Sequence, residues 1–511
     1  MYDPSDVIDK KFLDSLPESA TSALLKHATL NAEPPIERRI FVNRTLRMEG
    51  IEVVGFDLDW TLADYNRETM TRLTFDLTLS LLVSKKGYTE RVLEAEFRPD
   101  FPRRGLLVDC KTGIIIKMNR HRHVGRAYLG RRMLDVEERR SIYRRAPINP
   151  SSKRYYHVDT LFELAEVAVL SEVVELHERD PASLPIESYE KLFADIRSCI
   201  DQVHSDGSLK GEIMSDLPKY LTKDPDMPLA LRRLAMGGRK VVLITNSEWY
   251  FTNAICTYLL NDALPGFNHW SDFFDLVVVS SRKPAFFRDK NPFIELDDAG
   301  EALREVEVPD WGGVYQGGSR FGLSALFQCP GDSVLYVGDH IYGDVLSPKM
   351  QSMWRTALVV RELEEELQER ARVGRLIARQ QRLQFELTEL GTHADDLRDI
   401  GDLLRNLAEK GEELPEALGE AIAEKLNSLG TEHRLMRYRT AELGAKMSED
   451  FNPYWGSLFK QGRNKSLFGN QVDDFACLYT SRASNFAAYG SRHYYRVVRD
   501  PMMHELDQDM D

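Results

Sequence analysis

The stretch Ile51-Glu-Val-Val-Gly-Phe-Asp57-Leu-Asp59-Trp-Thr61 decides how this chain of 511 residues folds. It opens with a short apolar, β-branched run, which is typical of a buried strand. Two carboxylates follow, and on a continuing strand they would point the same way and repel each other. A divalent cation with oxygen ligands would remove that cost. The structural alternative is a capped turn before a helix, with Asp59 or Thr61 as the N-cap.

Strands and helices alternate from residue 220 onward. Helical patterns lie at 228–236 and 250–260, and apolar runs predict further strands at 240–244, 274–280, 333–338 and 356–360. Short buried strands separated by helices imply a parallel sheet with helices on both faces. The sequence therefore predicts an α/β fold with a doubly wound parallel sheet.

Polar side chains follow three of these later strands as well. Thr245-Asn-Ser247 comes after one strand, Lys283 after another, and Asp339-His-Ile-Tyr-Gly-Asp344 after a third. In parallel sheets the working residues lie beyond the carboxyl ends of the strands. Phosphoryl transfer requires a nucleophile, an acid, a metal site and a cation. Such residues at four strand ends predict a phosphoryl-transfer site rather than a purely structural protein.

The composition limits the classes of protein that fit. Hydrophobic residues make up 42%, aromatic residues 10% and charged residues 29% of the chain, which excludes a disordered protein. The net charge of −14 and the pI near 5.5 disfavour a nucleic-acid-binding protein. There is no signal-peptide pattern, no run of about 18 apolar residues and no Cys-x-x-Cys pair. We therefore expect a cytoplasmic protein with reduced thiols and with neither a membrane nor a nucleic acid as its partner.

The strings DLDWT (57–61), TNS (245–247), RKPAFF (282–287) and GDHIYGD (338–344) resemble, in this order, the four signature motifs of the haloacid dehalogenase superfamily of aspartyl-phosphatases. The similarity is greater to one branch, the cytosolic purine 5′-nucleotidases that hydrolyse inosine and guanosine monophosphates. GFDLDWTLADYN, LITNSEWYFT, YVGDHIYGDVL and WGSLFKQGRNKSLFGNQV all look like that branch. The resemblance extends from about Arg39 to Glu505 and includes the helical stretch after residue 360 more loosely.

The resemblance implies a role for each residue that matches these motifs. Asp57 would be the nucleophile that becomes a phospho-aspartate. Asp59 would be the general acid and base, and its main-chain carbonyl would also bind Mg²⁺. Thr245 and Asn246 would hold the transferring phosphoryl group, and Lys283 would neutralise its charge. The metal ligands would be Asp57, Asp59, Asp339 and Asp344, the last of which would support the metal or the lysine.

The segment between the first two motifs would form a cap that carries the nucleoside pocket. The matching positions are Phe162, for stacking on the base, with Arg197, Asp201, His204 and Lys210. Arg197 and Asp201 lie four residues apart on a predicted helix, so both can face one pocket. The alternative is an ordinary surface ion pair between them, which contributes only about 0.3–0.5 kcal/mol.

Two positions depart from the purine branch. Asp159 stands in Asp159-Thr-Leu-Phe162 where those enzymes have an amide, and a carboxylate changes which edge of the base can be hydrogen-bonded. Ser205 replaces a bulkier aromatic residue, which weakens any inference of activation by purine nucleotides. Asp159 therefore joins the candidate pocket residues as the position that bears on base preference.

Five regions follow from the motifs and the composition. They are an N-terminal segment (1–47), a catalytic core (48–65 and 221–360), the inserted cap (66–220), a helical arm (361–445) and an aromatic-rich C-terminal segment that packs on the core and ends in an acidic tail (446–511).

Three local patterns add detail to these regions. Within the cap, residues 105–117 predict a strand hairpin and residues 161–176 a core helix. The basic residues over 117–145 favour a solvated cap face or a subunit contact over a nucleic-acid patch. In the arm, leucines with irregular heptads favour an antiparallel helical hairpin over a coiled-coil dimer.

The sequence thus predicts a Mg²⁺-dependent 5′-nucleotidase that converts purine nucleoside 5′-monophosphates (IMP/GMP-like) to nucleoside and phosphate. One alternative is a phosphatase or phosphotransferase of the same superfamily that acts on a different phosphomonoester. Another is a catalytically idle interaction protein that keeps the fold. The resemblance also suggests a homo-oligomer, either a dimer or a tetramer.

Overall fold

The computed structural model describes residues 34–143, 148–413 and 415–497. They divide into two compact units: one contains the residues up to Glu364 and from Leu458 onward, and the other covers residues 365–457. The polar residues before 34 and the acidic tail after 497 lie outside the described residues. No described helix combines the length and the apolar composition that a membrane span requires.

The first unit is built on one large sheet. In spatial order its described strands are β1 (Phe41–Val42), β20 (Leu478–Thr480), β17 (Arg355–Val359), β16 (Val334–Gly338), β3 (Val53–Phe56), β11 (Lys240–Ile244), β12 (Leu276–Val279), β15 (Val314–Gly317), β13 (Phe293–Leu296) and β14 (Ala302–Val306). The strands from β20 to β15 pair in parallel. Antiparallel pairs occur only toward the two edges of the described sheet, at β1, β13 and β14. The predicted parallel sheet is confirmed.

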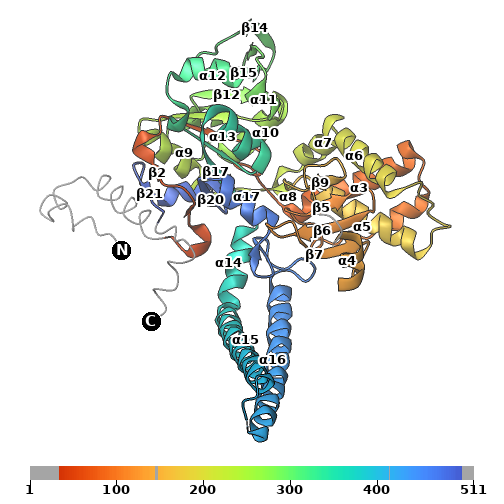
Figure 1. Cartoon of the computed structure of the whole chain (residues 1–511). Helices are drawn as coiled ribbons and strands as arrows, with labels where there is room; N and C mark the ends of the chain where they lie inside the picture. The colour runs from red at the N-terminus through yellow and green to blue at the C-terminus, as the bar shows by residue number, and fades with distance from the viewer. Residues whose placement is uncertain (1–33, 144–147, 414, 498–511) are drawn as a thin grey trace, which may run out of the picture. The chain divides into compact units, whose positions relative to one another are not determined.

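The centre of this sheet is covered on both faces. Every residue of β3, β12 and β16 is buried, although successive side chains of a strand point to opposite faces. Val242 and Ile244 of β11 pack on one face against Phe286 and Phe287, and Leu243 between them is fully buried on the other. This burial confirms the doubly wound fold. The core helices labelled in Figure 1 are α9 (Asp226–Met236), α10 (Trp249–Leu260), α11 (Ala285–Arg288), α12 (Arg320–Phe327), α13 (Ser347–Ser352) and α17 (Leu467–Phe475).

Between β4 (Asp64–Tyr65) and β10 (Leu221–Thr222), which pair antiparallel, the chain builds an insertion with a sheet of its own. In spatial order that sheet contains β8 (Arg132–Met133), β7 (Val124–Leu129), β6 (Ile114–Met118), β5 (Leu107–Asp109) and β9 (Tyr155–His157). The helices of the insertion are α3 (Arg67–Lys86), α4 (Val136–Tyr143), α5 (Leu164–Arg179), α6 (Tyr189–Ser205), α7 (Ser208–Ser215) and α8 (Leu217–Tyr220). The predicted hairpin is β5–β6 and the predicted core helix is α5, so both predictions are confirmed.

Basic residues of the insertion bind acidic groups and carbonyls of the same unit. The Lys117 ammonium donates to the Lys460 carbonyl at 2.9 Å, and Arg132 pairs with Glu138 at 2.8 Å. Arg131 pairs with the buried Glu172 at 2.6 Å. These pairs agree with the interpretation of an internally balanced cap face.

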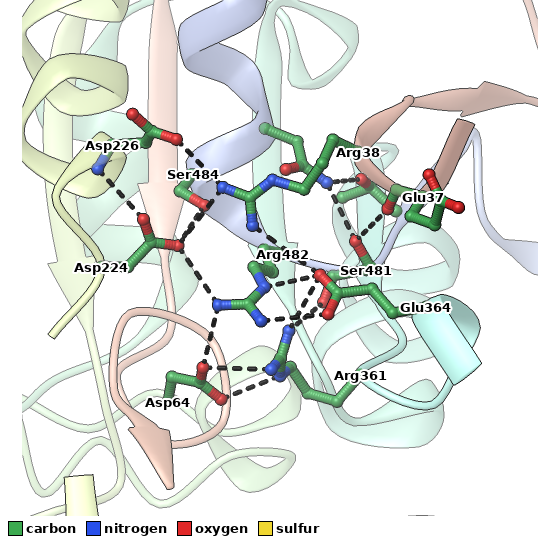
Figure 2. Close-up of polar contacts among 12 residues, drawn as sticks. Glu37, Arg38, Asp64, Asp224, Asp226, Arg361, Glu364, Ser481, Arg482 and Ser484 are labelled. Carbon is green, nitrogen blue, oxygen red and sulfur yellow. Dashed lines mark hydrogen bonds and ion pairs between the residues drawn. The ribbon is translucent and has the colours of Figure 1, made fainter. Parts of the chain in front are cut away.

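Charged side chains tie both crossings of the insertion to distant segments of the unit (Figure 2). Asp64 of β4 lies 2.8 Å from Arg361 and 3.3 Å from Arg482. Asp224, just beyond β10, accepts a hydrogen bond from the Ser484 hydroxyl at 2.6 Å and lies 3.7 Å from Arg482. Arg361 follows β17, and Arg482 and Ser484 follow β20. Segments far apart in the sequence therefore fix the two places where the insertion joins the core.

The C-terminal segment is part of the central sheet as well as packing on it. Its strand β20 pairs in parallel with β17 and antiparallel with β1, so it extends the sheet toward the N-terminal strand. The ring of Phe459 lies 5.9 Å from that of Phe468 and 6.3 Å from that of Tyr479. These ring contacts lie within the segment itself, and its strand β20 was not predicted from the sequence. The remaining short strands are β2 (Leu46–Arg47), β21 (Tyr494–Tyr495), β18 (Lys460–Gln461) and β19 (Asn464–Lys465).

The second unit is the predicted helical hairpin. After the end of α14 (Leu363–Arg372), the helices α15 (Gly374–Glu409) and α16 (Glu416–Phe451) run side by side in opposite directions (Figure 1). Buried or half-buried positions recur every three or four residues. They form one seam, with Leu376, Gln380, Leu383, Leu387, Leu390, Ala394, Leu397, Gly401 and Leu404 in α15 and Ile422, Leu426, Leu429, His433, Met436, Thr440, Leu443 and Met447 in α16. The heptads are therefore regular. The leucines alone are spaced irregularly, because small and polar residues occupy some of the seam positions.

Candidate active site

Four parallel strand ends meet at one edge of the central sheet. Strand β3 lies between β11 and β16, and β12 lies on the far side of β11. Asp57 follows β3, Thr245 follows β11, and Asp339 follows β16, while Lys283 lies in the loop after β12. At β3 the strand order reverses, and such a switch point opens a crevice for ligands. The structure therefore brings the four sequence motifs to one place.

Asp57, Asp339 and Asp344 form a carboxylate cluster that fits a divalent cation. One oxygen atom of each lies within 4.8 Å of the others. Asp339 and Asp344 are buried, and Oδ2 of Asp339 has no hydrogen-bond donor among the described residues. A buried oxygen without a donor is costly, and a metal ion would satisfy it. Mg²⁺ prefers such hard oxygen ligands.

Lys283 places a buried positive charge beside this cluster. Its Nζ lies 2.9 Å from Oδ1 of Asp57 and 2.8 Å from Oδ1 of Asp344. The ammonium also donates to the Tyr336 hydroxyl at 2.8 Å, and that hydroxyl donates to the Ile244 carbonyl at 2.8 Å. Burial acts to lower the pKa of Lys283, but Asp344 and Asp57 outweigh it and hold the pKa above its usual range. Lys283 is therefore a fixed cation.

Burial and neighbouring charges shift the pKa of the Asp57 carboxyl. Burial raises its pKa to about 7, Lys283 opposes this shift, and the nearby carboxyls of Asp344 and Asp59 add to it. The Asp57 amide donates to the Val337 carbonyl at 2.9 Å, which extends the β3–β16 ladder by one residue. The sheet thus fixes the main chain of Asp57.

Two glycines of the motifs make room for this arrangement. A Cβ added to Gly55 would lie 2.7 Å from Cδ2 of Tyr336, the residue that binds Lys283. A Cβ added to Gly338 would lie 2.4 Å from Cβ of Asp344. Contacts this short do not occur between real side chains, so a larger residue at either position would displace a member of the site.

The Asp59 carboxyl lies apart from the carboxylate cluster and is held by two hydroxyl groups. Tyr65 donates to its Oδ1 at 2.6 Å, and Ser247 donates to its Oδ2 at 2.7 Å. Tyr65 belongs to β4, directly before the insertion, and Ser247 follows β11, so two segments of the core fix this side chain. Such a fixed carboxyl suits proton transfer.

Thr245 and Asn246 shape the loop that carries Lys283. The Thr245 hydroxyl is buried and accepts from the Ser247 amide at 3.1 Å. Oδ1 of Asn246 accepts from the Lys283 amide at 2.6 Å and from the Ser281 hydroxyl at 2.9 Å. Its Nδ2 donates to the Lys283 carbonyl at 3.1 Å. The side-chain contacts of Asn246 thus fix the Lys283 loop.

Arg104 is a residue of this site that the sequence analysis missed. Its fully buried guanidinium donates to the main-chain carbonyl of Asp339 at 2.9 Å and lies 3.8 Å from Oδ2 of the same residue. It also forms a bidentate pair with the buried Glu362. Burial acts to raise the pKa of Glu362, but the guanidinium outweighs this and holds the pKa at about 2. Arg104 lies in the insertion and has no motif, so only the tertiary contact reveals it.

Phe162 and His204, two of the candidate pocket residues, lie together near Trp60 in the loop that follows β3. The Phe162 ring lies 5.9 Å from Trp60 and 5.7 Å from His204. Nδ1 of His204 lies 2.8 Å from the Ile200 carbonyl, which can only accept, so this nitrogen carries the proton. Burial lowers the pKa of His204 and keeps the ring neutral. Its Nε2 is then a buried acceptor without a donor among the described residues.

Arg197 and Asp201 form the ion pair that was the alternative to a pocket. Nη2 of Arg197 lies 2.9 Å from Oδ1 of Asp201, whose side chain is 67% exposed. Nη1 of Arg197 donates to the Tyr156 hydroxyl at 2.7 Å and contacts the buried Glu166. Burial raises the pKa of Glu166 to about 8, and Arg197 opposes this shift. The groups that the guanidinium contacts thus all belong to the insertion.

Lys210 connects the insertion with the core, whereas Asp159 lies near charged groups of the insertion. Lys210 contacts Glu248 and lies 5.3 Å from the ring centroid of Phe251 in α10. Burial raises the pKa of Asp159, while the charges of His157 and Arg104 oppose this shift. Asp159 therefore lies within electrostatic reach of the arginine that holds Asp339.

Comparisons with known proteins identify the family of this chain. The model of the 5′-nucleotidase family matches residues 40–507. A 5′-nucleotidase domain-containing protein of Dictyostelium discoideum is 31% identical over 479 residues, which cover 91% of this chain and 75% of that protein. A solved structure of a haloacid dehalogenase-like family hydrolase from Xanthomonas campestris is 12% identical and covers 62% of this chain and 86% of its own. Its TM-score of 0.24 is too low to say more. The chain belongs to the 5′-nucleotidase family, a family of phosphoric monoester hydrolases.

Proposed function

We propose that this chain is a Mg²⁺-dependent 5′-nucleotidase that hydrolyses purine nucleoside 5′-monophosphates to nucleoside and phosphate. The observation that carries the proposal is the cluster of Asp57, Asp339 and Asp344 with Lys283 at the switch point of the sheet. Family membership supports a nucleotide substrate. The purine base, the metal and the covalent intermediate are our inference.

In the first half of the reaction, a carboxylate oxygen of Asp57 attacks the substrate phosphorus and an acyl phosphate forms. The bond from phosphorus to the 5′ oxygen breaks, and Asp59 donates a proton to that oxygen. The Tyr65 and Ser247 hydroxyls hold the Asp59 carboxyl in one orientation during this step. Lys283, already charged, stabilises the negative charge on the phosphoryl oxygens.

In the second half, a water molecule attacks the phosphorus of the acyl phosphate. Asp59 takes a proton from that water, the bond between phosphorus and Asp57 breaks, and phosphate leaves. Mg²⁺, held by Asp57, Asp339 and Asp344 with the Asp59 carbonyl, would neutralise phosphate oxygens and so favour attack in both halves. Thr245 and Asn246 would position the phosphoryl group through the loop that they hold.

The insertion would act as the cap that binds the nucleoside. Phe162 offers a ring for stacking on the base, and Nε2 of the neutral His204 offers an acceptor for a donor group of the ligand. Arg197, Asp201, Lys210 and Asp159 are the further candidates for this pocket, and Asp159 would bear on which purine is preferred.

Phosphate release from a panel of phosphorylated metabolites tests this proposal. We expect the full chain with Mg²⁺ to cleave IMP or GMP, and Asp57→Asn to lower kcat by about 10³-fold or more. The matched control Asp298→Asn changes an exposed aspartate of the same unit and should leave the rate unchanged.

The outcome separates the alternatives. Cleavage of other phosphomonoesters but not of purine monophosphates would replace the substrate and keep the chemistry. A full chain that is inactive on the whole panel, or an Asp57→Asn variant as active as the wild type, would contradict the nucleophile assignment. We also propose a cytoplasmic location, which cell fractionation would test.

A further inference from the structure

In the arm formed by α15 and α16, the two helices pack on each other through one seam of each helix. A Cβ built on Gly401 would lie 3.8 Å from Cγ2 of Ile422, and one on Gly444 would lie 2.7 Å from Nε2 of Gln380. The antiparallel register therefore puts residue 401 level with 422 and residue 380 level with 444. Off the seam, the side chains face outward. Six large apolar ones, at 385, 400, 403, 418, 435 and 438, are 39–68% exposed.

The charges of the arm are separated along its length. One band carries a net positive charge, because the exposed side chains of Arg375, Arg379, Arg382, Arg434, Arg437 and Arg439 outnumber those of Glu389 and Glu442 there. The other band, nearer the turn between the helices, is acidic. It includes the exposed side chains of Asp395, Asp396, Asp399, Asp402, Glu420 and Glu424. At 1.5 Å of rise per residue, the centres of the two bands lie about 25 Å apart.

Within one copy these charges remain largely uncompensated. No ion pair is found for the six arginines of the basic band in the part of the chain that the structure describes. The ion pairs found in the acidic band are two short-range ones, Asp395–Arg398 and Asp402–Arg405. The charge pattern of one arm is complementary to that of an identical arm that runs in the opposite direction. Two identical arms laid in opposite directions would match each basic band with an acidic one.

The exposed apolar side chains fit the same arrangement. Tyr438 is level with Phe385, inside the basic band, whereas Ile400 and Leu403 lie inside the acidic band. When the bands of two reversed arms face each other, the aromatic pair of one arm comes within about one helical turn of Ile400 of the other. A two-fold axis repeats each contact, as in an isologous interface. Four antiparallel helices packed in this way are a common and stable bundle.

We propose that the arm is a self-association surface on which a second copy of this chain pairs its own arm in the opposite direction, basic band against acidic band. This inference is independent of the proposed catalytic function, because every residue that it uses belongs to α15 or α16. It names the surface for the homo-oligomer that the sequence suggested.

Sedimentation velocity of the full chain tests this surface with two charge reversals. One variant reverses the basic band (Arg434→Glu, Arg437→Glu and Arg439→Glu), and the other reverses the acidic band (Asp399→Arg, Glu420→Arg and Glu424→Arg). Glu and Arg both favour helix, so the arm should still fold, which circular dichroism checks. The control Glu301→Arg with Glu305→Arg reverses two exposed charges in the other unit, one directly before β14 and one within it.

We expect the wild type to associate with a Kd that rises about 10-fold or more from 50 to 500 mM NaCl. Each reversal variant alone should show a Kd at least about 100-fold higher or an assembly of half the mass, because equal charges then face each other at both ends. An equimolar mixture of the two variants should restore the wild-type mass, because every contact pairs opposite charges again.

The proposal is overturned by a wild type that stays monomeric up to about 100 μM. Reversal variants with the wild-type Kd and mass, or a mixture that fails to associate, would overturn it equally. A β14 control that dissociates as strongly as the arm variants would assign the interface to the other unit.

Discussion

At the scale of single residues, Asp339 depends on Arg104 for its place in the carboxylate cluster. The guanidinium binds the Asp339 main-chain carbonyl at 2.9 Å, whereas the Oδ2 atom of the same residue has no donor among the described residues. Glu362 balances the charge of Arg104, so the arginine does not need the Asp339 carboxylate as its counter-ion. Arg104 is therefore a positioning residue that leaves a ligand oxygen available.

The substitution Arg104→Met tests this role. It removes the guanidinium that pairs with the buried Glu362, which should lower the free energy of unfolding by about 3–5 kcal/mol. The double variant Arg104→Met with Glu362→Met removes both charges and should recover most of that loss. In isothermal titration of the protein without substrate, both variants should bind Mg²⁺ about 10-fold more weakly than the wild type. A double variant with wild-type Mg²⁺ affinity would show that Arg104 serves only the fold.

Asp159→Asn tests the link to base preference. A carboxylate only accepts hydrogen bonds, and the guanine edge offers two neighbouring donor groups where hypoxanthine offers one. We expect kcat/KM for GMP to fall about 10-fold more than kcat/KM for IMP, because a charge-assisted hydrogen bond is lost. Steady-state kinetics with both nucleotides give this ratio. An unchanged ratio would place Asp159 outside the base pocket.

The sequence identifies the motif residues of the site but not the residues that hold them. Asp57, Lys283 and Asp339 stand at strand ends in strings that can be read in the chain. Arg104 contacts Asp339 at 2.9 Å and Tyr336 contacts Lys283 at 2.8 Å, and in both cases the partner is more than 50 positions away in the sequence. The local sequence around Arg104 and Tyr336 does not predict these contacts. Gly55 is a weak indication of the contact with Tyr336, because a glycine within a strand often marks a place where another group approaches the main chain closely.

At the scale of elements, the site depends on how closely the parallel strands and their loops approach. The loop after β16 turns back through one π-helical turn, η7 (Ile341–Leu346), which carries Asp344 to the carboxylate cluster. Such turns are frequent at functional sites. Gly338 allows the approach, since a Cβ there would meet Asp344.

We expect Gly338→Ala to displace η7. The clash with Asp344 should lower the free energy of unfolding by about 1–3 kcal/mol and lower kcat, because Asp344 would leave both the cluster and Lys283. Gly211→Ala is the matched control, because the structure leaves nothing within 4 Å of a Cβ at this helical position. It should be neutral or slightly stabilising. Equal losses from both variants, measured by denaturant unfolding and initial rates, would contradict this reading of the glycine.

Among the elements, buried β-branched strands and amphipathic helices could be predicted from the sequence. Short strands that form only because neighbouring strands supply their hydrogen bonds could not. Strands β11, β12, β16 and β17 follow from their apolar runs. Strand β20 has only three residues and is a strand because β17 and β1 supply its hydrogen bonds. The regular seam of the arm was missed because leucine alone does not mark it: glycine, threonine and glutamine occupy some of its positions.

At the scale of the whole molecule, the catalytic unit depends on contacts between its core and its insertion. Arg104 of the insertion binds Asp339 of the core, and Tyr65, directly before the insertion, binds Asp59. The network of Figure 2 then fixes both ends of the insertion, since Arg482 contacts Asp64 at one crossing and Asp224 at the other. The network should therefore set how firmly the cap is held over the core.

Arg482→Met should loosen these crossings. Removing the shared cation leaves Asp64, Asp224 and Glu364 short of a partner, so we expect the free energy of unfolding to fall by about 2 kcal/mol. KM for the nucleotide should rise more than kcat falls, because the catalytic cluster does not contain this residue. Arg398→Met removes an exposed pair within one helix and should cost less than about 0.5 kcal/mol. A KM equal to that of the wild type would show that the network of Figure 2 does not affect substrate binding.

The most direct test of the proposed site is a crystal structure of the full chain grown with Mg²⁺ and a phosphate mimic such as beryllium fluoride. Our account predicts one metal ion about 2.1 Å from oxygens of Asp57 and Asp339, with the mimic bonded to the Asp57 carboxylate and in contact with Lys283. A metal bound elsewhere, or a mimic that leaves Asp57 free, would contradict it.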